Sequence, residues 1–294
     1  MRISLLDFQH PGAAVTFACA ADEWGFRRYW LGEHHAPAQC ANPLLLGALL
    51  AGVTSRIRIG SGGVSLTYSS PYRVAEDARL VEFMIPGRFD LGVTRGLMAP
   101  GSIAQALFDG RRASTDDYYA RLELLHALVT GRSIGAVPSD WEPYLEAGPP
   151  MWVLGLSAQS AAVAGRLGTG FCFSLHHAAP GADARGIIDR YRAQFAPSAE
   201  FPEPVVIVVA RFICGATAFE AQELAALASP SHPSLAPTIV GVAGDCVEQF
   251  CAIGRDLGAE EIMLLDFLQQ RQDARLDMYG RIAEAAGLSR QAAV

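Results

Sequence analysis

The stretch ISLLDFQHPG, residues 3–12, decides between the two common arrangements of parallel strands. Residues 3–8 are largely apolar, which predicts a buried strand, and residues 13–24 then have helical spacing. In an open doubly wound sheet, the turn between the first strand and the first helix normally carries the phosphate-binding pattern G-x-G-x-x-G. The turn here reads DFQHPG and lacks that pattern. The stretch therefore favours a closed barrel over an open sheet.

Short apolar runs and helically spaced stretches alternate along the rest of the 294 residues. Strands that alternate with helices form parallel βαβ units, and eight strands in this length predict an α/β fold, a (β/α)8 TIM barrel. We expect a single barrel domain over residues 1–294, because the Pro- and Ser-rich stretches 197–204 and 229–237 lie inside the alternation as loops. The predicted strands are residues 3–8, 29–31, 57–66, 89–93, 151–154, 170–175, 205–214 and 261–267.

The composition excludes several classes of function. The chain contains no lysine, which Schiff-base aldolases, pyridoxal phosphate enzymes and P-loop nucleotidases all need. Its net charge of −7 argues against broad nucleic-acid binding. The longest apolar runs, such as residues 205–210, are too short to span a membrane, and the first residues lack the apolar core of a signal peptide. We therefore expect a cytoplasmic protein without a membrane or nucleic-acid partner, whose six cysteines, with no CxxC pair, stay reduced.

Two adjacent histidines follow the second predicted strand. The active site of a (β/α)8 barrel lies at the carboxyl ends of the strands, which places the Glu-His-His sequence of residues 33–35 at the catalytic face. Asp7, Asp266 and the histidines at 176–177 also follow strands, as they would in a barrel metallohydrolase. Adjacent residues of a strand point to opposite faces, so a tandem His-His pair rarely supplies two metal ligands. We therefore predict no metal site.

Two neighbouring strand ends predict a phosphate site. The fourth strand ends in Arg95-Gly96, and the helix after the fifth strand begins with Ser157 as its N-cap and Ser160 three residues later. Because these strands are neighbours in a barrel, the Arg95 guanidinium and the free N–H groups of the helix start should lie close together, as phosphate binding requires. Glycines at positions 60, 62 and 63 of the third strand suggest a bulge, or a flat ligand lying against the backbone.

With these motifs the sequence resembles the bacterial luciferase-like flavin monooxygenase family. The resemblance is carried by WLGEHH at residues 30–35, by RIGSGGV at 58–64 running to SPYRVAED at 70–77, and by GRFDLGVTRG at 87–96. A weaker match covers residues 153–168. The resemblance is dense over residues 1–96 and thin after residue 175. The order and spacing of the three amino-terminal motifs make it specific.

The resemblance implies a barrel that binds reduced FMN at its mouth, reacts with O2 and oxygenates a small organic substrate. It implies that His34, the first histidine of the motif, is catalytic, and that Gly62 and Gly63 are joined by a cis peptide bond under the isoalloxazine ring. The residues implied to bind the flavin phosphate are Arg95, Leu156, Ser157 and Ser160. Leu156 stands where the family usually has an acidic or small residue, which argues against a side-chain contact there.

Three functions compete. The first is a two-component FMN-dependent monooxygenase that receives reduced flavin from a separate reductase, because the chain lacks a dinucleotide fingerprint. The second is an F420-dependent hydride-transfer enzyme on the same barrel, which we disfavour because its longer anionic cofactor usually meets more cations than Arg95. The third is a non-catalytic flavin-binding protein. Such relatives tend to lose the barrel-mouth histidine, whereas His34 is retained.

The resemblance also implies a homodimer, formed through the helices near residues 42–54 and 73–84, both of which are apolar. The substrate would then face the wall made by strands six to eight. We predict that this wall contains residues 174–177, Arg211, Asp266 and Phe267, which suit a small hydroxylated or carbonyl compound. Hydroxylation and Baeyer–Villiger insertion both stay open as reaction types.

Overall fold

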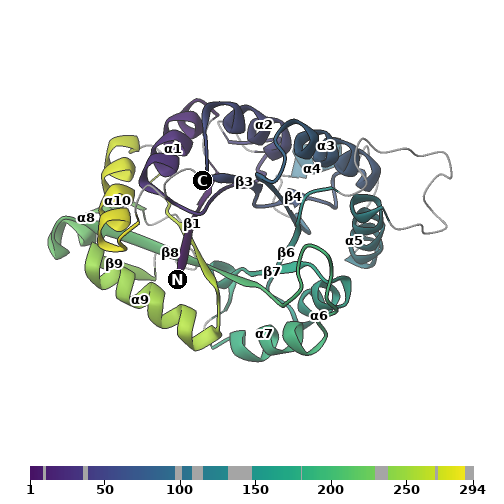
Figure 1. Cartoon of the computed structure of the whole chain (residues 1–294). Coiled ribbons are helices and arrows are strands. Elements are labelled where there is room, and N and C mark those ends of the chain that lie inside the picture. The colour runs from purple at the N-terminus through teal and green to yellow at the C-terminus, as the bar shows by residue number, and fades with distance from the viewer. Residues whose placement is uncertain are drawn as a thin grey trace.

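The computed structural model of the chain describes residues 1–8, 11–35, 39–96, 101–107, 115–131, 148–179, 181–228, 238–268 and 271–288. Parallel strands form a closed ring, and helices surround it (Figure 1). Because β10 pairs with both β1 and β8, the ring has no open edge. This confirms the predicted (β/α)8 TIM barrel. Its strands are, in order, β1 (Arg2–Asp7), β2 (Arg28–Leu31), β3 (Arg58–Ser61), β5 (Phe89–Thr94), β6 (Met151–Gly155), β7 (Gly170–Phe173), β8 (Val206–Gly215) and β10 (Glu261–Leu265).

Two short strands lie off this ring. The strand β4 (Val64–Ser65) follows the Gly62–Gly63 peptide bond and pairs with β5, so it continues β3 toward the barrel mouth. The strand β9 (Ile239–Val242) pairs with the last residues of the ten-residue strand β8, which runs out of the ring toward α8 and β9 in Figure 1. The sequence patterns did not predict β9, which directly precedes a helix.

The helices begin and end at recognisable capping residues. The helix α2 begins after Asn42, whose side chain accepts a hydrogen bond from the backbone N–H of Leu45 at 3.0 Å, and α6 ends at Gly168, whose φ of 68° is left-handed. No described helix is long and apolar enough to cross a membrane. The helices are α1 (Pro11–Trp24), α2 (Pro43–Val53), α3 (Pro71–Met84), α4 (Gly101–Leu107), α5 (Thr115–Thr130), α6 (Ala158–Leu167), α7 (Ala184–Ala193), α8 (Ala218–Ala228), α9 (Ala243–Leu257) and α10 (Gln272–Ala285), with a 3₁₀ turn η1 (Leu175–His177).

The strands bury both of their faces. Side chains that point out of the ring pack under the helices, and those that point inward fill the barrel. Trp30 and Trp152 lie edge to face inside it, with ring centroids 5.9 Å apart. Leu6 and Leu154 belong to the same inner cluster and also line the floor of the barrel mouth. A ligand inside the ring must therefore sit at the mouth, above these residues.

The amino end of the barrel interior buries a network of paired charges. The Asp90 carboxylate accepts hydrogen bonds from Arg28 at 3.0 Å, Arg58 at 2.7 Å and the Trp152 indole at 3.0 Å. Arg28 also pairs with Glu261. Burial opposes ionisation of Asp90, yet the two arginines outweigh it and hold its pKa below the ordinary value. These residues stabilise the scaffold and leave little at this end to attract a ligand.

Candidate functional site

The carboxyl ends of the strands surround a cavity of about 260 Å³, which we call the mouth cavity. It brings together five of the residues predicted from the sequence, which reach it from the ends of β2, β3, β5 and β6. They are His34, Gly62, Gly63, Arg95 and Leu156. Ser157 and Ser160, the two other residues predicted to bind the flavin, are not among those that line it.

His34 is held as a half-buried imidazole at this cavity. Its Nδ1 lies 3.1 Å from Oε1 of Gln39, and its ring centroid lies 4.6 Å from that of Phe8. Because Oε1 of Gln39 is an acceptor, Nδ1 carries the proton and Nε2 is left as the basic nitrogen. Burial lowers the pKa of His34, and the hydrogen bond to Gln39 offsets only part of that effect. At neutral pH the ring is therefore neutral and can accept a proton.

Glu33 and His35 form a clamp beside His34. The Glu33 carboxylate accepts a hydrogen bond from the backbone N–H of Ser65 at 2.8 Å, and its other oxygen lies 2.7 Å from Nε2 of His35. The carboxylate thereby ties the end of β2 to β4. This geometry gives His35 a structural role. No sequence pattern indicated the contact with Ser65, because it depends on where the chain goes after Gly62–Gly63.

The glycines of the third strand form a flat wall. The peptide bond between Gly62 and Gly63 is cis, as the family resemblance implied. A Cβ atom on Gly62 would lie 2.9 Å from the Leu6 side chain, and one on Gly63 would lie 2.9 Å from the carbonyl oxygen of Gly92. Side chains are excluded by neighbouring strands at both positions, so bare backbone faces the cavity. We call residues 62–63 the glycine wall.

Arg95 lies at the other end of this wall, exposed at the end of β5. Its charge acts on Tyr118 of α5, whose side chain is only 2% exposed. Burial raises the pKa of Tyr118, and the nearby Arg95 guanidinium opposes that rise. The Tyr118 hydroxyl has no hydrogen-bond partner among the described residues. No sequence pattern indicated Tyr118, because a tyrosine inside a helix looks like an ordinary core residue.

The start of α6 is closed by a capping box. The Ser157 hydroxyl accepts a hydrogen bond from the backbone N–H of Ser160 at 3.1 Å, and the Ser160 hydroxyl accepts one from the N–H of Ser157 at 3.2 Å. The predicted cap is confirmed, and both hydroxyls are engaged within it. By helix geometry, the N–H groups of Ala158 and Gln159 have no acceptor inside the helix. A contact of Ser157, Ser160 or the exposed Leu156 with phosphate stays a prediction.

The predicted substrate wall is only partly correct. His176 and His177 line the mouth cavity, but Asp266 points out of the ring toward α10, where its carboxylate accepts hydrogen bonds from Arg275 and Tyr279, both at 2.8 Å. Asp7 also pairs with Arg275, at 3.2 Å. Neither aspartate can reach a ligand in the mouth. Within the described ranges, no group of three His, Cys, Asp or Glu residues is arranged to hold a metal ion.

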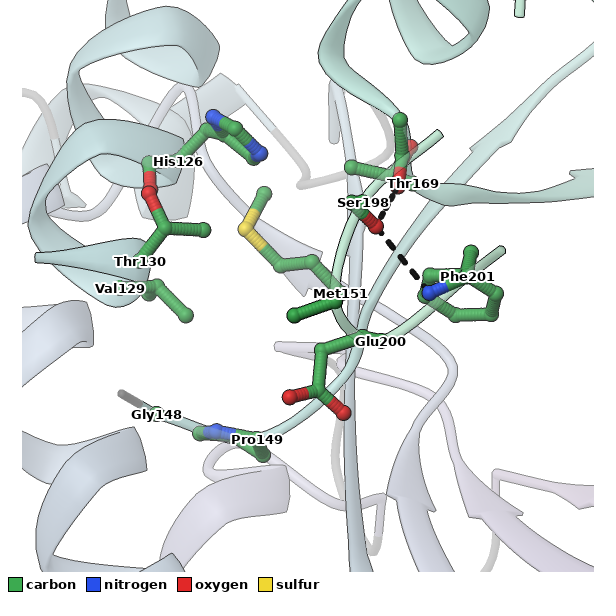
Figure 2. A pocket seen from close by; sticks show the side chains of 12 residues that line it. His126, Val129, Thr130, Gly148, Pro149, Met151, Thr169, Ser198, Glu200 and Phe201 are labelled. Atoms are coloured by element: carbon green, nitrogen blue, oxygen red, sulfur yellow. Dashed lines mark hydrogen bonds between the residues drawn. The ribbon is translucent and has the colours of Figure 1, made fainter. Parts of the chain in front are cut away.

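A second cavity, of about 170 Å³, lies at the amino ends of β6 and β7 (Figure 2). We call it the foot cavity. Met151, His126 and Glu200 are among its lining residues, and the Ser198 hydroxyl in its wall bonds to the Gly168 carbonyl oxygen at 2.8 Å. Active sites of (β/α)8 barrels lie at the opposite end of the strands. The foot cavity therefore belongs to the scaffold.

Comparison with known proteins identifies the family of the chain. A family model described as luciferase-like monooxygenase matches residues 4–290. The chain belongs to the luciferase-like monooxygenase family. Of its curated relatives, the uncharacterized protein YwcH of Bacillus subtilis (strain 168) is 35% identical over 223 residues, which are 72% of this chain and 65% of that protein. The N-acetyl-S-alkylcysteine monooxygenase of the same organism is 35% identical over 195 residues, covering 59% of this chain and 57% of that enzyme.

The match spans about 65% of the length of YwcH, so the luciferase-like relatives extend beyond the aligned part. Among solved structures, apo-MsnO8 superposes with a TM-score of 0.82 at 29% identity, covering 99% of both chains. Two others share the fold alone. A type II Baeyer–Villiger monooxygenase from Pseudomonas putida in complex with FMN has a TM-score of 0.73 at 16% identity, covering 98% of both chains. An F420-dependent secondary alcohol dehydrogenase has a TM-score of 0.72 at 15% identity, covering 97% of this chain and 98% of that chain.

Proposed function

We propose that the chain is a two-component flavin-dependent monooxygenase, which takes reduced FMN from a separate reductase and uses O2 to oxygenate a small organic substrate. The observation that carries this proposal is the mouth cavity, where His34, the glycine wall and Arg95 line one space at the catalytic end of a luciferase-like barrel. We further propose that residues 1–294 are one barrel domain that works in the cytoplasm.

The residues of the mouth fit the two ends of FMN. Arg95, the Tyr118 hydroxyl and the N–H groups at the start of α6 would hold the phosphate. An unpartnered buried hydroxyl costs about 1–3 kcal/mol, and a phosphate oxygen would remove that cost at Tyr118 by accepting its hydrogen. The isoalloxazine ring would lie against the glycine wall, where bare backbone allows a flat ring to approach closely. When bound, reduced FMN supplies the electrons that activate O2.

His34 would hold and move a proton at the reacting end of the site. Its Nδ1 is engaged by Gln39, which orients the ring and leaves Nε2 as the nitrogen that exchanges a proton. The Phe8 ring packs against the imidazole, with the ring centroids 4.6 Å apart and the planes tilted by 45°. The Glu33 clamp fixes the strand end from which His34 projects. This division assigns chemistry to His34 and positioning to Glu33 and His35.

The alternative is an F420-dependent hydride-transfer enzyme, a function that the F420-dependent neighbour of the same fold keeps open. The small number of basic groups at the phosphate end argues against F420 as the cofactor. Among the described residues that line the mouth cavity, Arg95 is the one arginine, and the chain has no lysine. The longer anionic tail of F420 would need more cations than this.

Anaerobic titration separates the cofactors. Reduced FMN and reduced F420 are added in separate experiments, and quenching of tryptophan fluorescence reports binding. We expect reduced FMN to bind at least about tenfold more tightly, a difference of roughly 1.4 kcal/mol. Tighter binding of F420 would contradict the proposal. Binding of reduced FMN whose reaction with O2 does not change in His34→Ala would indicate a non-catalytic flavin-binding protein instead.

We also propose a homodimer formed through α2 and α3, which pack against one another and carry large exposed apolar side chains. These are Leu45, Leu49 and Val53 on α2, and Leu80, Phe83 and Met84 on α3. Burying such a patch stabilises a self-complementary interface. Sedimentation at micromolar concentration should give twice the chain mass of 31.3 kDa, and Leu49→Arg should shift it to the single-chain mass. A single-chain mass for the wild type would overturn the dimer.

A further inference from the structure

Two of the six cysteines meet where α9 packs on the outer end of β8. Cys214 is the last residue but one of β8, and Cys246 lies in the first turn of α9. This helix contacts both β8 and the neighbouring strand β9. Both thiols are free, and both are buried, with exposures of 1% and 0%. The two residues are far apart in the chain, so the packing of α9 on the sheet brings them together.

A glycine of β9 leaves the space in which the two thiols meet. In the register of β8 and β9, Cys214 pairs with Gly241. A Cβ atom on Gly241 would lie 3.9 Å from Sγ of Cys246. The same sulfur lies 3.8 Å from the carbonyl oxygen of Ile213, the residue before Cys214. Paired residues of neighbouring strands point to the same face and are about 4.8 Å apart. The Cys246 sulfur therefore lies beside the Cys214 side chain.

The two thiols interact directly and unequally. A hydrogen bond links their side chains. This bond lowers the pKa of Cys214 although burial opposes the change, and it raises the pKa of Cys246, as burial also does. The thiolate, and not the thiol, attacks an oxidant. Cys214 is therefore the nucleophile of the pair, and Cys246 is the neighbouring thiol that can attack its oxidised form.

We propose that Cys214 and Cys246 are a reversible modification site, which hydrogen peroxide converts to an intramolecular disulfide. The Cys214 thiolate attacks one peroxide oxygen, so that an S–O bond forms, the O–O bond breaks and hydroxide leaves to become water. The Cys246 sulfur then attacks the Cys214 sulfur. An S–S bond forms, the S–O bond breaks, and the oxygen leaves as a second water with the proton of Cys246. The two thiols lose two electrons, and the peroxide gains them.

The disulfide would join α9 covalently to β8. It would close a loop of about 30 residues, which restricts the unfolded chain and stabilises the folded one. Reduced flavin that reacts with O2 without oxygenating a substrate yields hydrogen peroxide, so an enzyme of the proposed kind would meet this oxidant. The inference goes beyond the proposed function and stands without it, because peroxide can be added directly to the chain.

The test treats the chain, without flavin, with hydrogen peroxide and then blocks the remaining thiols with iodoacetamide. Digestion after glutamate places Cys214, Cys246 and Cys251 on separate peptides. Glu220 lies between the first two, and Glu248 between the last two. We expect mass spectrometry to find the peptide that ends at Glu220 joined to the one that ends at Glu248, and dithiothreitol to separate them. Alkylation of both Cys214 and Cys246 after peroxide, or a link that includes Cys251, would overturn the inference.

Variants separate the pair from the other thiols. Cys246→Ala should abolish the link and leave Cys214 with added oxygen, because the second thiol is missing. Cys251→Ala is the matched control, since it removes a more exposed cysteine of the same helix and should leave the link unchanged. Peroxide should raise the thermal midpoint of wild type by about 5 °C, and that of Cys246→Ala not at all. Equal midpoint shifts in both proteins would contradict the cross-link. The wild-type peptide map decides the question if Cys246→Ala does not fold.

Discussion

The two ends of the barrel interior bury basic groups in opposite ways. At the amino end, Arg28 and Arg58 share the Asp90 carboxylate, and Arg28 also pairs with Glu261. At the mouth, burial lowers the pKa of His34 and of His176, so both imidazoles are neutral at pH 7. Paired charges in a closed interior hold a scaffold together, whereas neutral imidazoles that line a cavity can exchange protons with a bound ligand.

The largest effect on stability should come from disrupting the ion pairs at the amino end of the barrel. Asp90→Ala leaves two buried arginines without their carboxylate, so we expect a loss of about 3–5 kcal/mol in the free energy of unfolding. Denaturant unfolding at constant pH measures it. Arg166→Ala is a matched control, since it removes an exposed ion pair with Glu123 and should change stability by less than about 1 kcal/mol. Equal losses in both variants would show that the Asp90 network is not what stabilises the barrel.

The pH dependence of stability gives a second test of the Asp90 ion pairs. The folded pKa of Asp90 lies below its unfolded value, which is about 3.9. Its stabilising contribution is therefore fully present above pH 4 or so, and is lost as the pH falls through the folded pKa. Wild type should lose this part of its stability in acid, and Asp90→Ala should not. Parallel stability curves for the two proteins below about pH 4 would contradict the assignment.

At the mouth, His34→Ala should leave the fold and the binding of reduced FMN intact. It should slow the reaction of bound reduced FMN with O2 by about a hundredfold, because positioned acid–base groups typically contribute that much or more. Stopped-flow absorbance measures the rate. His35→Ala removes a partner of the Glu33 clamp and should instead lower stability by about 1 kcal/mol, with a rate near that of wild type. The reverse pattern would exchange the roles of the two histidines.

Substitutions at the proposed phosphate site should cause smaller losses, in the affinity for reduced FMN. Tyr118→Phe removes the buried hydroxyl without changing the shape of the ring, and should weaken reduced FMN by about fivefold to tenfold. Ser157→Ala should weaken it less, because the backbone donors at the start of α6 survive the change. Ser157→Ala should also destabilise the chain by about 1 kcal/mol through loss of the cap. Unchanged FMN affinity in Tyr118→Phe would remove this residue from the site.

Much of the fold and part of the site could be read from the sequence. Apolar runs mark all eight barrel strands, because strands buried on both faces are continuously apolar. The same property hides which face of a strand points inward, and Asp266 was placed on the wrong side for that reason. The family resemblance located the cis peptide bond at Gly62–Gly63.

The contacts that complete the site join residues far apart in the chain. Glu33 reaches the Ser65 N–H, and Arg95 acts on Tyr118. Neither pair leaves a local pattern, because each depends on how successive βα units pack around the ring. At Ser160, the position three residues after the N-cap was predicted correctly. Its buried hydroxyl bonds to Ser157 within the cap, and a contact with phosphate stays a prediction.

A four-way titration tests the central claim most directly. Wild type and Arg95→Ala are each titrated with reduced FMN and with reduced riboflavin under nitrogen. Arg95 should contact only the phosphate, which riboflavin lacks, so the variant should lose about tenfold to a hundredfold in affinity for FMN and nothing for riboflavin. That loss corresponds to a charge-assisted contact of roughly 1.5–3 kcal/mol. Equal losses for both flavins would place Arg95 in the scaffold and contradict a phosphate-anchored flavin at the barrel mouth.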